Sequence, residues 1–115
     1  MRTPISGAQF RRDAKLAQKR GKDMAKLREI ILLLIEGKPL PPRYKDHPLG
    51  GEWSHHRESH IEPDWLLIYT IDADDLYLVR TGTHSDLFYL NYARGLKPRR
   101  GAGGGCRLGP LRILL

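Results

Sequence analysis

The chain has 115 residues, of which 40% are apolar and 29% are charged, and its formal net charge is +7. This length suits one small domain and excludes a multidomain enzyme or a cofactor-binding fold of about 250 residues. The longest apolar run, Ile30 to Ile35, is far shorter than the roughly 20 residues that span a bilayer. A single cysteine excludes an internal disulfide framework, and no N-terminal segment is typical of a signal peptide, so we expect a cytoplasmic protein without a membrane anchor.

The N-terminal part predicts a short strand and two helices. Met1–Ser6 favours a strand, in which Pro4 must lie at an edge or at the strand start. Apolar residues recur at helical spacing over Gln9–Arg20. Asp23 is a typical N-cap for a second helix, whose wide apolar stripe indicates deep burial and which should end at Gly37.

The middle of the chain predicts three strands. Residues 37–51 are rich in Pro and Gly and indicate an ordered loop, after which 52–57 alternates loosely as a strand. Residues 65–71 are apolar on both faces, as in a central strand, and 76–81 returns beside it after an Asp-Ala-Asp turn. Residues 83–88 indicate a short helical turn. The order (β)ααβββ predicts an α+β domain, with two helices packed on a small antiparallel sheet.

The last part, 89–115, differs from the domain that we assign to residues 1–88. It is rich in Gly and Arg, contains no acidic residue and shows no clear hydrophobic period. Such a segment buries too little apolar surface to offset its ordering entropy, so we expect it to be mostly disordered. A basic RNA-binding arm and a read-through or cloning artefact are alternative interpretations.

Charge is divided unevenly along the chain. The net charge is +8 over residues 1–45, −7 over 46–88 and +6 over 89–115. A basic segment attracts polyanions by releasing their counterions, so nucleic acid is a natural partner, although an acidic protein or plain solvation of a lysine-rich helix would fit as well. All five histidines lie in the acidic middle part: His47, His55, His56, His60 and His84.

A zinc site is not expected from these histidines. No cysteine lies near them, and the sequence has no HExxH motif. On the predicted strand, His55 and His56 would point to opposite faces and could not chelate one ion together. We therefore expect neither a metal nor a cofactor.

Ribonuclease chemistry fits the polar residues better. Cleavage of RNA through its own 2′-hydroxyl needs a base, an acid and positive charge near the phosphate, and histidine serves either proton role near neutral pH. His60 and Asp64 could approach each other across a proline bend, while Arg57 and Arg80 could hold the phosphate. Aromatic side chains that could stack on bases are Trp53, Trp65 and Phe88.

Each of these residues also has a structural interpretation. A loop histidine is more often exposed or hydrogen-bonded than catalytic. Trp65 precedes three apolar residues and fits a core position equally well, and Arg80 could pair with a carboxylate. Chemistry alone leaves the two interpretations open.

Four segments favour the catalytic interpretation, because they resemble a known protein family. Together they resemble a YafQ-type toxin of the RelE/ParE superfamily, in one order and with similar spacing from about Ile5 to Phe88. They are AKLAQKR (14–20), YKDHPL (44–49), HIEPDW (60–65) and RTGTHSDLF (80–88).

The resemblance implies an mRNA interferase, the toxin of a type II toxin–antitoxin pair. Such toxins enter the ribosomal A site and cut mRNA there without a metal, with the 2′-hydroxyl as nucleophile. It implies a RelE-like fold and the catalytic set His47, His60, Asp64 and His84, with Trp65 and Phe88 lining the site and Arg80 holding phosphate. We expect His84 to be the general acid, His60 with Asp64 to form the base side, and His47 to assist proton transfer or contact the phosphate.

The resemblance also implies partners. An acidic antitoxin would neutralise the toxin by direct binding, and the complex would bind operator DNA through the antitoxin. The basic first helix, through Arg11, Arg12, Lys15 and Lys19, would contact ribosomal RNA. The alternatives are a gyrase-type toxin of the same fold, a catalytically dead repressor subunit and a ribonuclease that acts without ribosomes.

Overall fold

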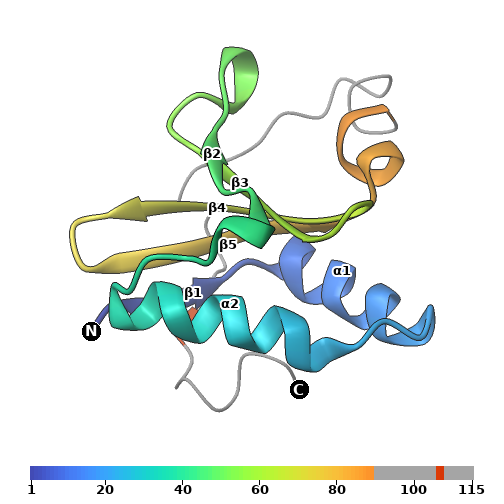
Figure 1. Cartoon of the computed structure of the whole chain (residues 1–115), viewed down its shortest axis with the longest axis horizontal. Helices are drawn as coiled ribbons and strands as arrows, with labels where there is room; N and C mark the ends of the chain where they lie inside the picture. Colours follow the sequence, from blue (N-terminus) through green and yellow to red (C-terminus); the bar gives the residue numbers. More distant parts are fainter. Residues whose placement is uncertain (90–105, 108–115) are drawn as a thin grey trace.

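Two helices cover one face of a six-stranded sheet in the computed structural model, which describes residues 1–89 and 106–107 (Figure 1). The helices are α1 (Ala8–Lys19) and α2 (Met24–Glu36). The short helical segments are η1 (Pro42–Tyr44), η2 (Gly51–Trp53) and η3 (Ser85–Tyr89). The strands are β1 (Thr3–Ser6), β2 (His47–Pro48), β3 (Arg57–Glu62), β4 (Trp65–Asp72), β5 (Asp75–Gly82) and β6 (Cys106–Arg107).

Both predicted helices are confirmed. In α1 the apolar residues Phe10, Ala14 and Ala17 are buried against the sheet, as their spacing predicts. Asp23 caps α2 by accepting a hydrogen bond of 3.0 Å from the Ala25 backbone N–H. Gly37 ends α2 in the left-handed conformation, with a φ of 72°, which glycine adopts without strain.

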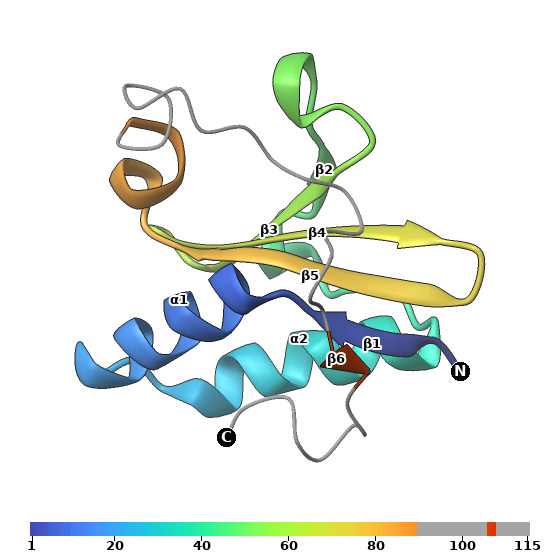
Figure 2. The ribbon, with the colours of Figure 1, turned by 180° about the vertical axis from the view of Figure 1, so that it is seen from behind.

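The α+β fold is confirmed, but the sheet is mixed rather than antiparallel throughout. Strands β2 to β5 pair antiparallel in chain order, whereas β1 lies beside β5 and runs parallel to it, with Ile5 opposite Tyr77. Two parallel strands need a long connection between them. Here the connection consists of α1, α2 and strands β2 to β4. On the other edge of β1, β6 pairs antiparallel with it (Figure 2). The rest of the tail beyond residue 89 lies outside the described residues, so the predicted disorder and the domain boundary stay predictions.

The predicted strand over 52–57 is wrong. Its first part is helical in η2, and the strand begins only at Arg57. Gly51 and His55 have φ values of 63° and 70°, which no extended strand can contain. His55 and His56 therefore precede the strand instead of alternating along it. The buried Tyr44 side chain fixes the loop before β3 to the core.

The sheet has an apolar cluster on each face. The larger one lies under the helices and includes Trp65, Leu67 and Tyr69 of β4. The smaller one joins Leu66 and Ile68, the alternate residues of the same strand, to Trp53 and Leu87. Glu58 and His60 lie directly opposite Ile68 and Leu66 on β3, so they share the face away from the helices.

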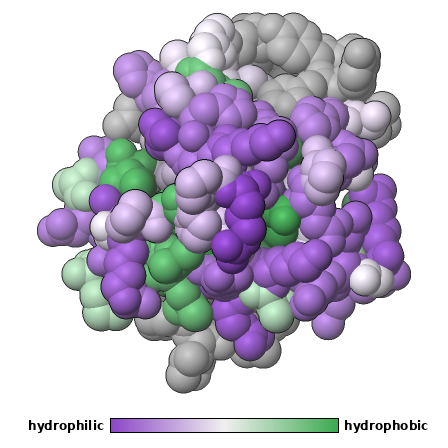
Figure 3. All heavy atoms as spheres, viewed as in Figure 1, coloured by the Kyte–Doolittle hydropathy of each residue, from purple (hydrophilic) through white to green (hydrophobic). Residues whose placement is uncertain are grey.

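The face of the molecule drawn in Figure 3 carries no large apolar surface among the described residues. Hydrophilic side chains cover most of that face, and the apolar ones form small separate patches (Figure 3). Within the described residues, neither helix has the length and apolar composition needed to cross a bilayer.

Candidate functional site

Three predicted histidines form a row on the sheet face away from the helices. His47 comes from β2, His60 from β3 and His84 from the segment between β5 and η3. The ring centroids of His47 and His60 are 5.7 Å apart, and those of His60 and His84 are 5.9 Å apart. His47 and His84 thus both lie beside His60, because β2 pairs with β3 and because Asp64, just after β3, hydrogen-bonds to His84.

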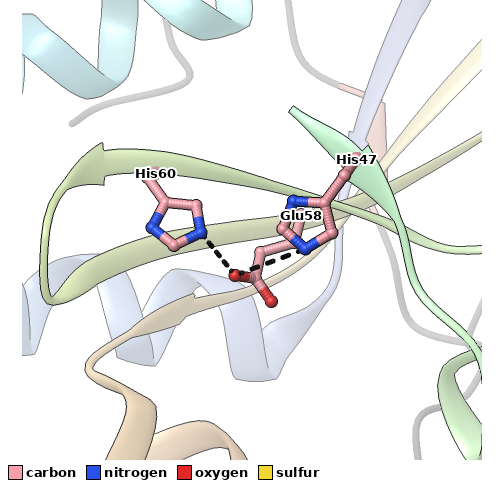
Figure 4. A group of neighbouring side chains, drawn as sticks. All are labelled: His47, Glu58 and His60. Carbon is pink, nitrogen blue, oxygen red and sulfur yellow. Dashed lines mark ion pairs between the residues drawn. The ribbon is translucent and has the colours of Figure 1, made fainter. Parts of the chain in front are cut away.

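A buried carboxylate that sequence reasoning missed lies between two of these rings. The Oε1 atom of Glu58 is 2.9 Å from Nε2 of His60 and 3.9 Å from Nε2 of His47 (Figure 4). The Glu58 side chain is only 7% exposed. Glu58 and His60 are two residues apart on one strand, so the alternation of side chains would have placed them on one face had the strand been predicted over 57–62.

The predicted pairing of His60 with Asp64 is not the pairing that the structure shows. Oδ1 of Asp64 instead accepts hydrogen bonds from His84, at 2.7 Å from the ring Nδ1 and 3.0 Å from the backbone N–H. The backbone hydrogen bond from His84, followed by the one from its ring, lowers the pKa of Asp64. His60 instead faces Glu58, which lies two residues before it on the same side of β3, and the β3–β4 register shifts only after His60. With Glu58 added, the candidates therefore form two pairs, His60–Glu58 and His84–Asp64, with His47 beside the first.

A reciprocal cap holds the segment that carries His84. The Thr83 backbone N–H donates to the Asp86 carboxylate at 3.1 Å, and the Asp86 N–H donates to the Thr83 hydroxyl at 3.1 Å. Arg20, at the end of α1, forms an ion pair of 2.7 Å with the same carboxylate. The hydrogen bond from Arg20 is the main reason that the pKa of Asp86 is lowered. His84 is thus placed by a contact that reaches back to α1.

Replacing Asp86 by Asn is expected to lower the free energy of unfolding by about 1–2 kcal/mol at pH 7, because the variant loses a charged cap. The pKa of Asp86 is lower in the folded chain than in the unfolded chain. The carboxylate therefore stabilises the fold above the unfolded pKa, and this contribution is lost as the pH falls through the folded pKa. Urea denaturation of both proteins should show the difference at pH 7 and a smaller one at a pH well below the ordinary aspartate pKa of about 3.9.

The matched control is Asp74→Asn, a change in an exposed residue of the β4–β5 turn. It should alter stability by less than about 0.5 kcal/mol at either pH. An Asp86→Asn difference of the same size at both pH values would contradict the electrostatic explanation.

Asp46 anchors the loop that presents His47. Its carboxylate accepts hydrogen bonds from Ser59 Oγ at 2.6 Å, from Arg57 Nε at 2.6 Å and from the Tyr69 hydroxyl. Burial and the Asp46 hydrogen bond raise the pKa of Tyr69, so the phenol stays protonated and donates. These donors come from β3 and β4, so the residue before His47 is fixed to the sheet.

Two predicted phosphate ligands are engaged in ion pairs. Arg57 contacts Asp46, yet its side chain is 42% exposed and keeps donors for a further anion. Arg80 is only 15% exposed, and its Nε lies 2.6 Å from the Asp13 carboxylate on α1. The second contact of this pair, from Arg80 Nη2, is 3.2 Å long. The geometry favours a structural role for Arg80 and leaves Arg57 available.

The two aromatic candidates whose side chains are described are both buried. Trp65 is 1% exposed, belongs to the core under the helices and donates its indole N–H to Thr81 Oγ1 at 3.0 Å. Trp53 is also buried, in the smaller cluster. Phe88 lies in η3, and its side chain is outside the described part of the chain.

The four basic candidates of α1 divide into two kinds. Arg11 is half-buried and donates to the Ser6 backbone carbonyl at 2.9 Å, so it holds the start of the helix. Arg12, Lys15 and Lys19 are exposed. Lys15 and Lys19 are four residues apart, which places them on one side of the helix.

Comparison with known proteins gives a consistent result. The family model described as "Bacterial toxin of type II toxin-antitoxin system, YafQ" matches residues 2–89. The mRNA interferase toxin YafQ of Escherichia coli K12 is 54% identical over 81 residues, which cover 70% of this chain and 88% of the relative.

Solved structures agree with the sequence matches. The chain superposes on a crystal structure of the E. coli DinJ–YafQ complex with a TM-score of 0.72 and 50% identity, over 76% of this chain and 99% of that one. A crystal structure of a metal-bound toxin from Helicobacter pylori gives a TM-score of 0.73 and 42% identity, over 76% and 100% of the two chains.

Proposed function

Because the chain belongs to the YafQ family of toxins from type II toxin–antitoxin systems, we propose that it is an mRNA interferase. Its substrate is mRNA in the ribosomal A site, and the nucleophile is the 2′-hydroxyl next to the scissile phosphate. The observation that carries this proposal is the row of three histidines, two of which are held by carboxylates. Such a row offers both a proton acceptor and a proton donor without a metal.

The pairs His60–Glu58 and His84–Asp64 suggest which histidine accepts a proton and which donates one. His60, with Glu58 against its Nε2, is the base side that takes the 2′-hydroxyl proton. His84 donates its Nδ1 hydrogen to Asp64, which leaves Nε2 to protonate the departing 5′-oxygen. One phosphate can contact both rings, because hydrogen bonds of about 2.6–3.2 Å to each reach across the 5.9 Å between the ring centroids. His47 of this row and Arg57 beside it, both half-exposed, are the groups that we place at the phosphate.

The product ends test this chemistry. Attack by the 2′-hydroxyl leaves a 2′,3′-cyclic phosphate on one fragment and a 5′-hydroxyl on the other, whereas hydrolysis by an activated water leaves a linear phosphate. Ribosomes programmed with labelled mRNA should give the cyclic product in the presence of a transition-metal chelator that leaves the Mg²⁺ of the ribosome in place. A 2′-deoxynucleotide at the cleavage site should abolish the reaction, and cleavage of that substrate would contradict the proposal.

The basic helix α1 contacts two kinds of macromolecule in this proposal. Its exposed side chains Arg12, Lys15 and Lys19 bind ribosomal RNA, and an acidic antitoxin competes for the same surface. The DinJ–YafQ complex shows that a relative at 50% identity binds a second protein. We place operator DNA on the antitoxin and the toxin itself in the cytoplasm, with the ribosomes.

Charge reversal tests the RNA contact. The double variant Lys15→Glu, Lys19→Glu should bind ribosomes more weakly, and the slope of log affinity against log salt should fall by about two. The control reverses Arg28 and Lys38, two exposed cations outside α1. Equal ribosome binding by the two double variants would contradict a specific role for α1.

A further inference from the structure

The corner between α1 and α2, residues 20–26, has a backbone that is fixed at both ends. Gly21 follows the C-cap of α1 in the left-handed conformation, with a φ of 83°, and its N–H donates to the Gln18 carbonyl at 3.0 Å. The Lys22 N–H donates to the Ala17 carbonyl at 3.1 Å, which completes a Schellman motif. One residue later, Asp23 caps α2. The side chains of the corner therefore extend from a well-fixed backbone.

Two lysines of this corner bind one carboxylate at the end of β3. Lys22 Nζ lies 3.0 Å from Oε1 of Glu62, and Lys26 Nζ lies 3.0 Å from Oε2. The hydrogen bond from Lys22, followed by that from Lys26, lowers the pKa of Glu62, so the carboxylate is ionised at neutral pH. Lys22 Nζ also lies 5.9 Å from the centroid of the Trp65 ring. The corner thus contacts the last residue of β3 and the first residue of β4.

The turn between these two strands carries Asp64. Only Pro63 and Asp64 lie between the end of β3 and the start of β4, and the Asp64 side chain is 66% exposed. Within the described part of the chain, the hydrogen bonds of its carboxylate both come from His84. An exposed residue on so short a turn keeps its position only if the residues beside the turn are held. Glu62 is held by its two lysines.

The same corner also holds the segment of His84. Arg20 pairs with Asp86 at 2.7 Å, as described above. Gly82 leaves room for this segment to fold back, because a Cβ at that position would lie 3.1 Å from Oδ2 of Asp86. The two members of the Asp64–His84 pair are thus tied to one rigid corner, by contacts that span 40 and 66 positions of the chain.

We infer that Glu62 is a positioning residue, which fixes Asp64 relative to His84 through its two lysine contacts. The inference rests on the proposed function, in which His84 protonates the departing 5′-oxygen. A misplacement of about 1 Å can cost about a hundredfold in rate, whereas partly exposed ion pairs contribute little to stability. Loss of the Glu62 carboxylate should therefore slow cleavage without unfolding the chain.

Two-dimensional ¹⁵N NMR of the full chain tests the positioning independently of activity. The probe is the backbone amide resonance of His84, because that N–H donates to Asp64, and an Asp64→Ala variant gives its position when the bond is absent. In Glu62→Ala the resonance should move toward that position. The control is Glu36→Ala, which removes an exposed carboxylate paired with Lys38 at the other end of α2. No movement in Glu62→Ala, or an equal movement in Glu36→Ala, would overturn the inference.

Single-turnover cleavage on programmed ribosomes tests the catalytic consequence. At saturating ribosome concentration Glu62→Ala should cleave about tenfold more slowly than wild type, with ribosome affinity changed by less than about twofold. Glu36→Ala should match wild type in both measurements. An unchanged cleavage rate in Glu62→Ala would overturn the positioning role. Failure of the wild-type protein to cleave would instead count against the proposed function, and the His84 amide resonance would still decide whether Glu62 positions Asp64.

A double-mutant cycle separates positioning from RNA binding by the lysines. The variant Lys22→Ala, Lys26→Ala should show the same slow cleavage as Glu62→Ala. Combining all three changes should slow cleavage no further, because the three side chains act as one unit. Weaker ribosome binding by the lysine variant at an unchanged maximal rate, or additive slowing in the combined variant, would show that the lysines do not act through Glu62 and would overturn the inference.

Discussion

Replacing His84 by Ala is expected to lower the rate of mRNA cleavage on ribosomes by about a hundredfold to ten-thousandfold, the usual contribution of a general acid or base. The fold should survive, because the His84 side chain is 46% exposed and its backbone N–H still reaches Asp64. Single-turnover cleavage of labelled mRNA on programmed ribosomes measures the effect, with thermal unfolding as the check on folding.

The matched control is His55→Asn, because His55 is exposed and lies outside the row of rings. Its cleavage rate should remain within about twofold of wild type. The cleavage rate of Asp64→Asn should lie between those of His84→Ala and His55→Asn. The amide oxygen can still accept the Nδ1 hydrogen of His84, but it carries no charge. Cleavage by His84→Ala at the wild-type rate would show that His84 takes no part in the reaction.

The second large effect concerns stability. Asp13→Ala is expected to lower the free energy of unfolding by about 3–5 kcal/mol, because it leaves the guanidinium of Arg80 buried without its partner. Asp13 and Arg80 are only 8% and 15% exposed, and the Asp13 carboxylate also accepts the Thr81 backbone N–H at 3.2 Å. One carboxylate therefore joins α1 to the strand that leads to His84. Urea denaturation at neutral pH measures the loss.

A paired replacement separates structure from substrate binding. Asp13→Leu combined with Arg80→Met removes both buried charges and should recover part of the stability that Asp13→Ala loses. If Arg80 is structural, the paired variant should cleave mRNA at close to the wild-type rate once folded. A stable paired variant that binds ribosomes but cleaves hundreds of times more slowly would show that Arg80 binds the phosphate. A loss below about 1 kcal/mol in Asp13→Ala would contradict the buried ion pair itself.

Local signals in the sequence were sufficient for most of the elements. The N-cap Asp23 and the terminating Gly37 set the bounds of α2, and the apolar run from Trp65 set β4. The signals failed where tertiary contacts decide the backbone. The pair of residues that forms β2 is too short to show a period, and positive φ values at Gly51 and His55 break an apparent alternation. The parallel placement of β1 depends on the packing of both helices.

The sequence pointed to four residues of the candidate site but missed Glu58 and the pairs that these residues form. Resemblance to the family pointed to His47, His60, Asp64 and His84, whereas their charge partners depend on the true strand bounds and on contacts between distant parts of the chain. Glu58 and His60 share a face because β3 spans Arg57–Glu62, and Asp64 contacts His84 across 20 positions of the chain. For the same reason Arg80 was assigned to a phosphate, although its partner Asp13 is 67 residues away in the chain.

The central claim is that this chain cuts mRNA only in the ribosome. The direct measurement compares cleavage of one labelled transcript on programmed ribosomes with a filled P site and as naked RNA, at the same concentration and in the same Mg²⁺-containing buffer. We expect a single cut in the A-site codon on ribosomes and a rate at least about a hundredfold lower on naked RNA, where nothing orients the scissile phosphate between the histidines. Equal rates on both substrates would show a free ribonuclease, and no cleavage of either would contradict the catalytic assignment of the histidine row.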